Sequence, residues 1–138
     1  MKSPVVLYRF GRKLDKLPVI QSIITLTIRL IYSCYLPCTA KIGKNLTLGY
    51  GGLGIVIHNE SEIGDNCHID QNVTIGGKRT INGVPKIGNN VYIGTGAVIL
   101  GPISIGDNCM IGANSVVITD IPNNSLVVGV PGKVRKVL

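Results

Sequence analysis

The sequence predicts an all-β fold in which short strands stack into a parallel β-helix. Three features support this prediction: a six-residue repeat of aliphatic residues, a high glycine content and a scarcity of aromatic side chains. The 138 residues include 18 glycines and no tryptophan, and only 4% of the chain is aromatic. Glycine suits frequent tight turns. A core of small aliphatic side chains without large rings suits many thin, equivalent layers.

An aliphatic residue recurs at every sixth position over much of the chain. The eleven successive positions are Ile57, Ile63, Ile69, Ile75, Ile81, Ile87, Ile93, Ile99, Ile105, Ile111 and Val117. An amphipathic helix would instead place apolar residues three and four positions apart. The period of six therefore predicts short strands, each with one inward aliphatic side chain, separated by turns.

Two segments interrupt the repeat. The glycine-rich residues 49–54 shift its phase relative to the earlier pair Ile42 and Leu48. Residues 77–86 keep Ile81 in phase but place Asn82 where the repeat usually has glycine. We predict that residues 77–86 form a loop extruded between two coils, and the alternative is one more ordinary repeat.

The N-terminal part of the chain has a different, helical periodicity. The apolar residues at helical spacing are Leu17, Ile20, Ile24, Ile28 and Ile31, and the opposite polar stripe is Gln21, Thr25 and Arg29. This pattern predicts a short amphipathic helix, docked on the end of the β-helix or lying on a membrane. We expect residues 1–38 to form a helical segment and residues 39–138 to form the β-helix domain.

The net charge of +7 is concentrated near the N-terminus. Residues 1–42 contain seven basic residues and one acidic residue, and the remainder of the chain is close to neutral. Nucleic-acid binders usually spread basic residues along a face with interleaved aromatics, so no nucleic-acid partner is expected. We expect a cytoplasmic protein with either a solvated basic helix or a peripheral contact with the inner face of the membrane. Arg29 near the centre of the apolar run disfavours a membrane-spanning helix.

Several runs resemble the hexapeptide-repeat acyltransferase family. They are Ile63-Gly-Asp-Asn-Cys, Ile93-Gly-Thr-Gly-Ala-Val-Ile and the ending Asp120-Ile-Pro-Asn-Asn-Ser-Leu-Val-Val-Gly-Val-Pro-Gly-Lys-Val. The resemblance is to the serine acetyltransferase-like branch, which is often found with polysaccharide-synthesis enzymes. It implies a left-handed β-helix with three hexapeptides per coil and a homotrimer with active sites between subunits. It also implies acetyl-CoA as the donor in an O-acetyl transfer.

His58 is the predicted catalytic residue. A hydroxyl group that attacks a thioester must lose its proton, and histidine is a natural general base near neutral pH. His58 and His68 are the two histidines of the chain. His58 directly follows the run Gly54-Ile-Val-Ile, near which the resemblance implies a histidine base. His68 is the alternative.

The remaining site predictions concern the donor, the acceptor and metals. By resemblance, the donor arm would lie along Gly94, Thr95, Gly96, Ala97, Gly112 and Ala113, and Lys133 and Arg135 would meet the CoA phosphates or form a solvated basic tail. Acceptor contacts are predicted for Tyr50, Asn59, Asp70, Asn72 and Lys78. No metal site is predicted, because the histidines and cysteines lack the spacing of metal ligands.

Departures from the serine acetyltransferase pattern guide the prediction of the acceptor. That pattern has an Asp-His pair where this chain has Gly49-Tyr50, and a histidine where this chain has Val84. Its upstream acidic residue aligns best with Tyr35. We therefore predict a hydroxyl of a sugar or polysaccharide precursor as the acceptor, with the L-serine of cysteine biosynthesis as the alternative.

Two alternatives belong to other classes of protein. A β-helical carbonic anhydrase would need three histidine ligands for zinc, and the chain has two histidines. A non-catalytic structural β-helix would need neither His58 nor the predicted loop.

Overall fold

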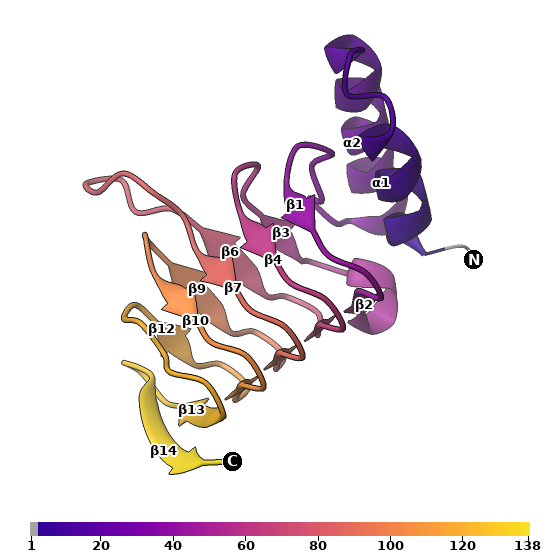
Figure 1. Ribbon diagram of the computed structural model, residues 1–138. Helices are drawn as coiled ribbons and strands as arrows, with labels where there is room; N and C mark the ends of the chain where they lie inside the picture. The colour runs from indigo at the N-terminus through magenta and orange to yellow at the C-terminus, as the bar shows by residue number, and fades with distance from the viewer. Residues whose placement is uncertain (1–2) are drawn as a thin grey trace.

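The computed structural model describes residues 3–138, and it consists of two helices followed by a β-helix (Figure 1). The helices are α1 (Pro4–Arg12) and α2 (Pro18–Tyr32), and a 3-10 turn, η1 (Gly49–Gly52), lies within the first coil of the β-helix. The strands are β1 (Lys41–Ile42), β2 (Thr47–Leu48), β3 (Val56–Ile57), β4 (Glu62–Ile63), β5 (His68–Ile69), β6 (Thr74–Gly76), β7 (Lys86–Ile87), β8 (Tyr92–Ile93), β9 (Val98–Leu100), β10 (Ser104–Ile105), β11 (Met110–Ile111), β12 (Val116–Val117), β13 (Ser125–Val128) and β14 (Lys133–Val137).

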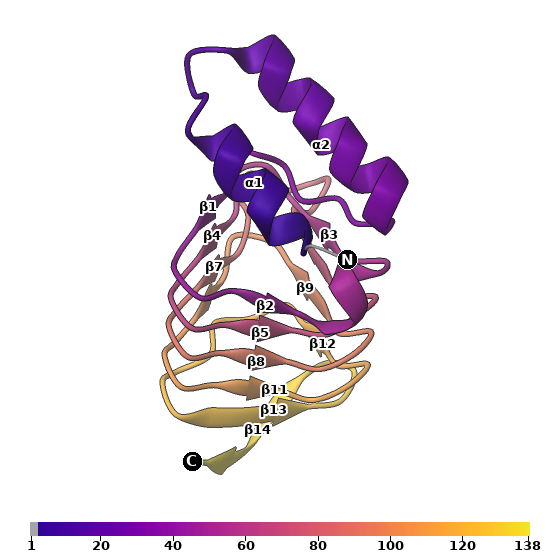
Figure 2. The same ribbon diagram turned by 90° about the vertical axis from the view of Figure 1, so that its right-hand side faces the viewer.

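The strands form three faces of a prism. Face one contains β1, β4, β7 and β10; face two contains β2, β5, β8, β11, β13 and β14; and face three contains β3, β6, β9 and β12. Each strand pairs in parallel with the strand one coil away, except that β14 pairs antiparallel with β13. Figure 2 shows the strands of face two stacked in this order. This architecture is the left-handed parallel β-helix that was predicted.

The core is the ladder of aliphatic residues predicted by the repeat. Ile57, Ile69, Ile93 and Ile111 each have 0% exposure. Ile81 is the exception, with 50% exposure, because it lies in the irregular segment between β6 and β7. Its agreement with the six-residue phase does not place it in a strand.

An asparagine ladder runs along the corner between face one and face two. Amide groups bond from coil to coil, through Asn45, Asn66, Asn90, Asn108 and Asn124. Successive rungs are 21, 24, 18 and 16 residues apart, so the longest coil is the one that contains residues 77–85. All five asparagines have φ values of +55° to +57°. Asparagine tolerates this left-handed conformation better than most residues, which explains its repeated use here.

The two helices form a cap on the first coil (Figures 1 and 2). The hydroxyl of Tyr8 donates to the carbonyl oxygen of Ala40 at 2.6 Å, and the guanidinium of Arg9 donates to that of Ile42 at 2.8 Å. These bonds anchor α1 to the chain that enters β1. The structure thus has two N-terminal helices where the sequence predicts one.

The orientation of α2 also differs from the predicted one. Ile24 and Ile28 are buried as expected, but Ile20 and Ile31 are 39% and 57% exposed. Gln21, from the predicted polar stripe, is buried instead, and its Nε2 donates to the carbonyl oxygen of Gly11 at 3.1 Å. The position of α1 decides this orientation, because its carbonyl group offers a partner to a glutamine and not to an isoleucine. Within residues 3–138, neither helix is long and apolar enough to span a bilayer.

Candidate functional site

The two histidines lie on different parts of the prism. His58 directly follows β3, at the corner where face three turns into face one. His68 is the first residue of β5, on face two. The two residues are therefore separated along the coil by a complete pass over face one.

His58 has backbone partners. Its backbone N–H donates to the carbonyl oxygen of Ile75 at 2.8 Å, and its Nδ1 accepts the backbone N–H of Glu60 at 3.2 Å. The first bond joins two coils, and the second holds the imidazole against the turn that follows. The role of His58 as a general base stays a prediction.

His68 belongs to a cluster of three side chains, with Asp70 and Tyr92. The Nε2 of His68 lies 3.0 Å from Oδ1 of Asp70, and the hydroxyl of Tyr92 donates to Oδ2 of the same carboxylate. The rings of His68 and Tyr92 are 5.4 Å apart between centroids. The hydrogen bond to Asp70 raises the pKa of Tyr92 above its ordinary value. We call these three residues the His68 cluster.

The sequence prediction included Asp70 and considered His68 but missed Tyr92. Tyr92 is the partner of His68 in the parallel pairing of β5 with β8. These residues are 24 positions apart in the chain, whereas the equivalent step from β8 to β11 is 18 positions. Recognising that residues 77–86 lengthen one coil would have brought Tyr92 beneath His68.

The predicted donor residues occupy the corner between face two and face three. The backbone N–H of Gly94 donates to the carbonyl oxygen of Ile111 at 2.8 Å. A Cβ on Gly94 would lie 2.8 Å from the backbone nitrogen of Ala113, so glycine is needed for the coils to stack this closely. Thr95 is half-buried and Ala113 is exposed. The corner therefore presents backbone and small side chains.

The predicted site residues do not all come together within one chain. Tyr50, Asp70 and Asn72 lie at the same corner as the donor residues, between face two and face three. His58 and Asn59 lie at the corner between face three and face one, as does Lys78 in the segment after β6. A linear period of six does not reveal which of the three corners each turn occupies.

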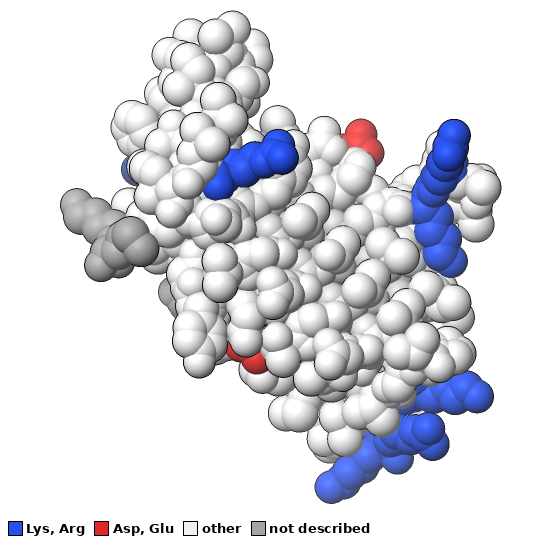
Figure 3. Space-filling model, turned by 180° about the vertical axis from the view of Figure 1, so that it is seen from behind, with Lys and Arg blue, Asp and Glu red and all other residues white. Residues whose placement is uncertain are grey.

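Lys133 and Arg135 lie on β14, at the C-terminal end of the prism, and both are exposed. On the face seen in Figure 3, basic side chains stand at this end, at the loop between β6 and β7 and beside the helical cap, and the surface between them is largely uncharged. The basic groups on this face are therefore separate from one another.

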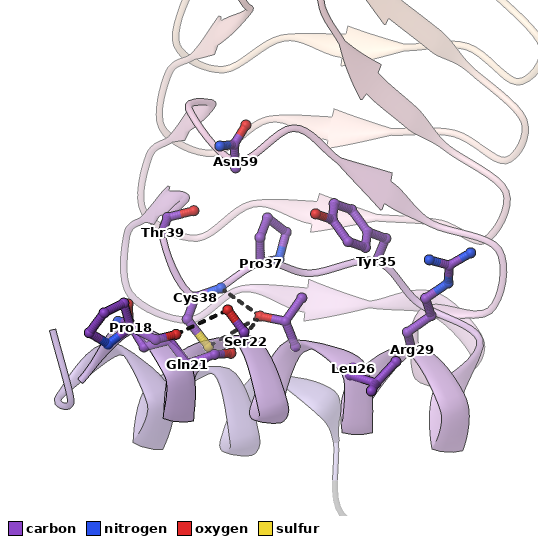
Figure 4. A pocket seen from close by; sticks show the side chains of 11 residues that line it. Pro18, Gln21, Ser22, Leu26, Arg29, Tyr35, Pro37, Cys38, Thr39 and Asn59 are labelled. Atoms are coloured by element: carbon purple, nitrogen blue, oxygen red, sulfur yellow. Dashed lines mark hydrogen bonds between the residues drawn. The ribbon is translucent and has the colours of Figure 1, made fainter.

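A groove of about 360 Å³ lies between α2 and the first two coils. Figure 4 shows Gln21, Ser22 and Arg29 of α2 on one side and Tyr35 and Pro37 on the other. Asn59 is the one predicted site residue in its lining. The groove thus lies apart from the predicted donor residues.

The described part of the chain, residues 3–138, contains no group of three His, Cys, Asp or Glu side chains placed to hold a metal ion. The four cysteines are unpaired and buried. Burial raises the pKa of Cys34 to about 12, so its thiol is a poor nucleophile.

Comparison with known proteins places the chain among acyl-transfer proteins. Residues 85–119 match the family described as bacterial transferase hexapeptide (six repeats). The serine acetyltransferase of Synechococcus elongatus is 40% identical over 122 residues, which cover 87% of this chain and 50% of that protein. The serine acetyltransferase of Staphylococcus aureus (strain Mu50) is 50% identical over 99 residues, which cover 70% of this chain and 46% of that protein.

A solved structure shows the same relationship. Serine acetyltransferase from Brucella abortus strain S19, in complex with coenzyme A, superimposes with a TM-score of 0.90 at 31% identity. The match covers 95% of this chain and 54% of that one. The chain spans about half the length of the curated relatives that it matches.

These relatives correct the prediction of the acceptor. The sugar or polysaccharide hydroxyl was wrong, because the matched proteins are named as serine acetyltransferases. The substitutions at Gly49-Tyr50 and Val84 were weighted too heavily in that prediction. They concern a few side chains, whereas the similarity extends over most of the chain.

Proposed function

We propose that this chain, which belongs to the hexapeptide-repeat transferase family, transfers the acetyl group of acetyl-CoA to the hydroxyl group of L-serine. The observation that carries the proposal is its similarity to serine acetyltransferases, which covers 87% of the chain in sequence and 95% in structure. This alternative, already considered from the sequence, replaces the sugar acceptor.

The proposed donor site is the corner between face two and face three. The small residues at Gly94–Ala97 and at Gly112 and Ala113 leave room for a long, flexible arm beside backbone groups. Lys133 and Arg135 would meet the phosphates, as a point charge and as a planar fork respectively. The coenzyme A complex of the Brucella abortus relative supports a donor of this kind.

The proposed active assembly is a homotrimer. The predicted site residues lie at two corners of one prism, and packing prisms side by side would place one corner of a subunit near a different corner of its neighbour. Asn59 and Lys78 would then approach the donor corner of the adjacent subunit. The mass of the protein in solution, measured by light scattering, tests this part of the proposal.

Thiol release from acetyl-CoA tests the activity. We expect release that depends on L-serine, with formation of O-acetylserine detected by mass spectrometry. L-Alanine is the matched control, because it lacks only the hydroxyl group that accepts the acetyl group. Release that is equal with L-serine and L-alanine would refute the proposed reaction.

A further inference from the structure

His58 has no free lone pair for a substrate proton. A neutral imidazole carries a proton on one nitrogen and a lone pair on the other. In His58 the lone pair must be on Nδ1, because Nδ1 accepts the backbone N–H of Glu60 at 3.2 Å. Nε2 then carries the proton. To act as a base, His58 would first have to break its bond to Glu60.

The tautomer of His68 is set by a different partner. A carboxylate can only accept hydrogen bonds, so the close contact of 3.0 Å with Oδ1 of Asp70 places the imidazole proton on Nε2. The other oxygen of Asp70 accepts the hydroxyl of Tyr92, and both donors therefore hold the carboxylate in place. The lone pair of His68 is on Nδ1, which makes no hydrogen bond within residues 3–138. The side chain of His68 is 42% exposed, so this nitrogen belongs to a ring that solutes can reach.

The His68 cluster is also continuous with the proposed donor corner. The backbone N–H of Asp70 donates to the carbonyl oxygen of Ile93, the residue before Gly94, at 2.9 Å. At Gln71, the residue after Asp70, the carbonyl oxygen accepts the hydroxyl of Thr95 from the next coil at 3.2 Å. The turn that holds Asp70 is thus bonded to the turn predicted to hold the donor. His58 lies at the corner between face three and face one, so in the proposed trimer it would meet that donor only across a subunit boundary, as Asn59 and Lys78 would.

We infer that His68 is the general base of the reaction, with Asp70 and Tyr92 as its positioning residues. This inference rests on the proposed function. The hydroxyl oxygen of the acceptor attacks the carbonyl carbon of the thioester, and Nδ1 of His68 takes the hydroxyl proton as the carbon–oxygen bond forms. The carbon–sulfur bond then breaks. The proton passes from His68 to the departing thiolate, which leaves O-acetylserine and the free thiol of CoA.

Substitution of each histidine by asparagine distinguishes the two candidates. Loss of a general base lowers rates by about 10²–10⁴-fold. We expect kcat with L-serine to fall by about 100-fold or more in His68→Asn, with little change in KM, and to fall at least tenfold less in His58→Asn. Circular dichroism and light scattering check that both variants keep the fold and assembly of the parent.

Imidazole rescue gives a second measurement that does not depend on comparing residual rates. Added imidazole should restore part of the kcat of His68→Ala, because it supplies the missing base in the space left by the side chain. Rescue of His58→Ala, or no rescue of a folded His68→Ala, contradicts the inference.

The positioning residues have a separate readout. In Asp70→Asn the amide NH₂ group could donate to Nε2 and move the imidazole proton to Nδ1, which would abolish the free lone pair. We expect a fall in kcat of at least tenfold with KM nearly unchanged. Tyr92→Phe leaves one of the two donors to Asp70 and should cause a smaller fall. A change in KM alone for Asp70→Asn would contradict a positioning role.

Measurements on the parent protein and on His68→Asn together distinguish failure of the proposed function from failure of the inference. Thiol release that does not depend on L-serine in the parent refutes both. Serine-dependent release that persists in His68→Asn refutes the inference alone.

Discussion

The β-helix and the helical cap differ in how they bury their side chains. In the β-helix, two-residue strands bury the second residue and leave the first at least partly exposed, as with Met110 and Ile111. In the cap, α2 buries Gln21 while Leu30, on the same helix, is 74% exposed. A strand in a closed coil has one inside and one outside, so each side chain has a fixed direction. A helix on the end of a prism can rotate about its axis, and its partners decide which side it buries.

The largest expected effect is in the core of the β-helix. Ile111→Ala removes a fully buried side chain from the ladder, and such substitutions cost about 2–5 kcal/mol of unfolding free energy. Met110→Ala, at the adjacent residue with 43% exposure, should cost about 0.5 kcal/mol or less. Urea unfolding measures both. Similar losses of unfolding free energy for the two variants would contradict the rule that each short strand buries one side chain and exposes the other.

The asparagine ladder tests the corners of the same region. Asn90→Ala should cost about 2 kcal/mol, because alanine is strained at a φ of +55° and both amide bonds of the rung are lost. Asn90→Gly loses the same bonds without the strain and should cost about 1 kcal/mol less. Thermal unfolding of both variants gives the difference. A glycine variant no more stable than the alanine variant would show that the left-handed conformation is not what selects asparagine.

In the cap, we expect a polar side chain to contribute more to the free energy of unfolding than its apolar neighbour. Gln21→Ala removes the buried hydrogen bond to Gly11 and should cost about 1–2 kcal/mol. Ile20→Ala, at the preceding residue of the helix, should cost less because its side chain is 39% exposed. Chemical unfolding compares the two variants directly. If Ile20→Ala proves the more costly, then α2 buries the side indicated by its apolar spacing.

The smallest effect at neutral pH concerns Cys34, where the cap meets the first coil, because its contribution changes only at alkaline pH. Burial raises its pKa from 9.0 to about 12 in the folded protein. The unfolded chain therefore releases this proton first, and the folded state should lose stability as the pH rises from about 9 towards 12. In Cys34→Ala this part of the pH dependence should disappear. Urea midpoints at pH 7, 9 and 10.5 for parent and variant provide the test, and equal pH dependence would count against a folded-state shift at Cys34.

The contacts around the predicted site residues could be predicted only in part from the sequence, for a reason of geometry. The six-residue period identified the turns that carry glycine and polar residues, including Asp70 and Gly94. It did not show that Tyr92 contacts Asp70 and His68, because those contacts depend on the length of the intervening coil. Asp70 is two residues from His68, but Tyr92, which bonds to Asp70, lies one coil away, where sequence distance is a poor guide.

The sequence by itself determined the β-helix, because an aliphatic residue at every sixth position can be buried only when successive coils stack. It also predicted a loop at residues 77–86, where glycine, proline and charge replace the repeat, with one more ordinary repeat as the alternative. The tertiary structure decided the orientation of α2, the corner occupied by each turn and the position of Tyr92 against Asp70. These features depend on hydrogen bonds between distant segments, such as Gln21 with Gly11 and Tyr92 with Asp70, which a local pattern does not encode.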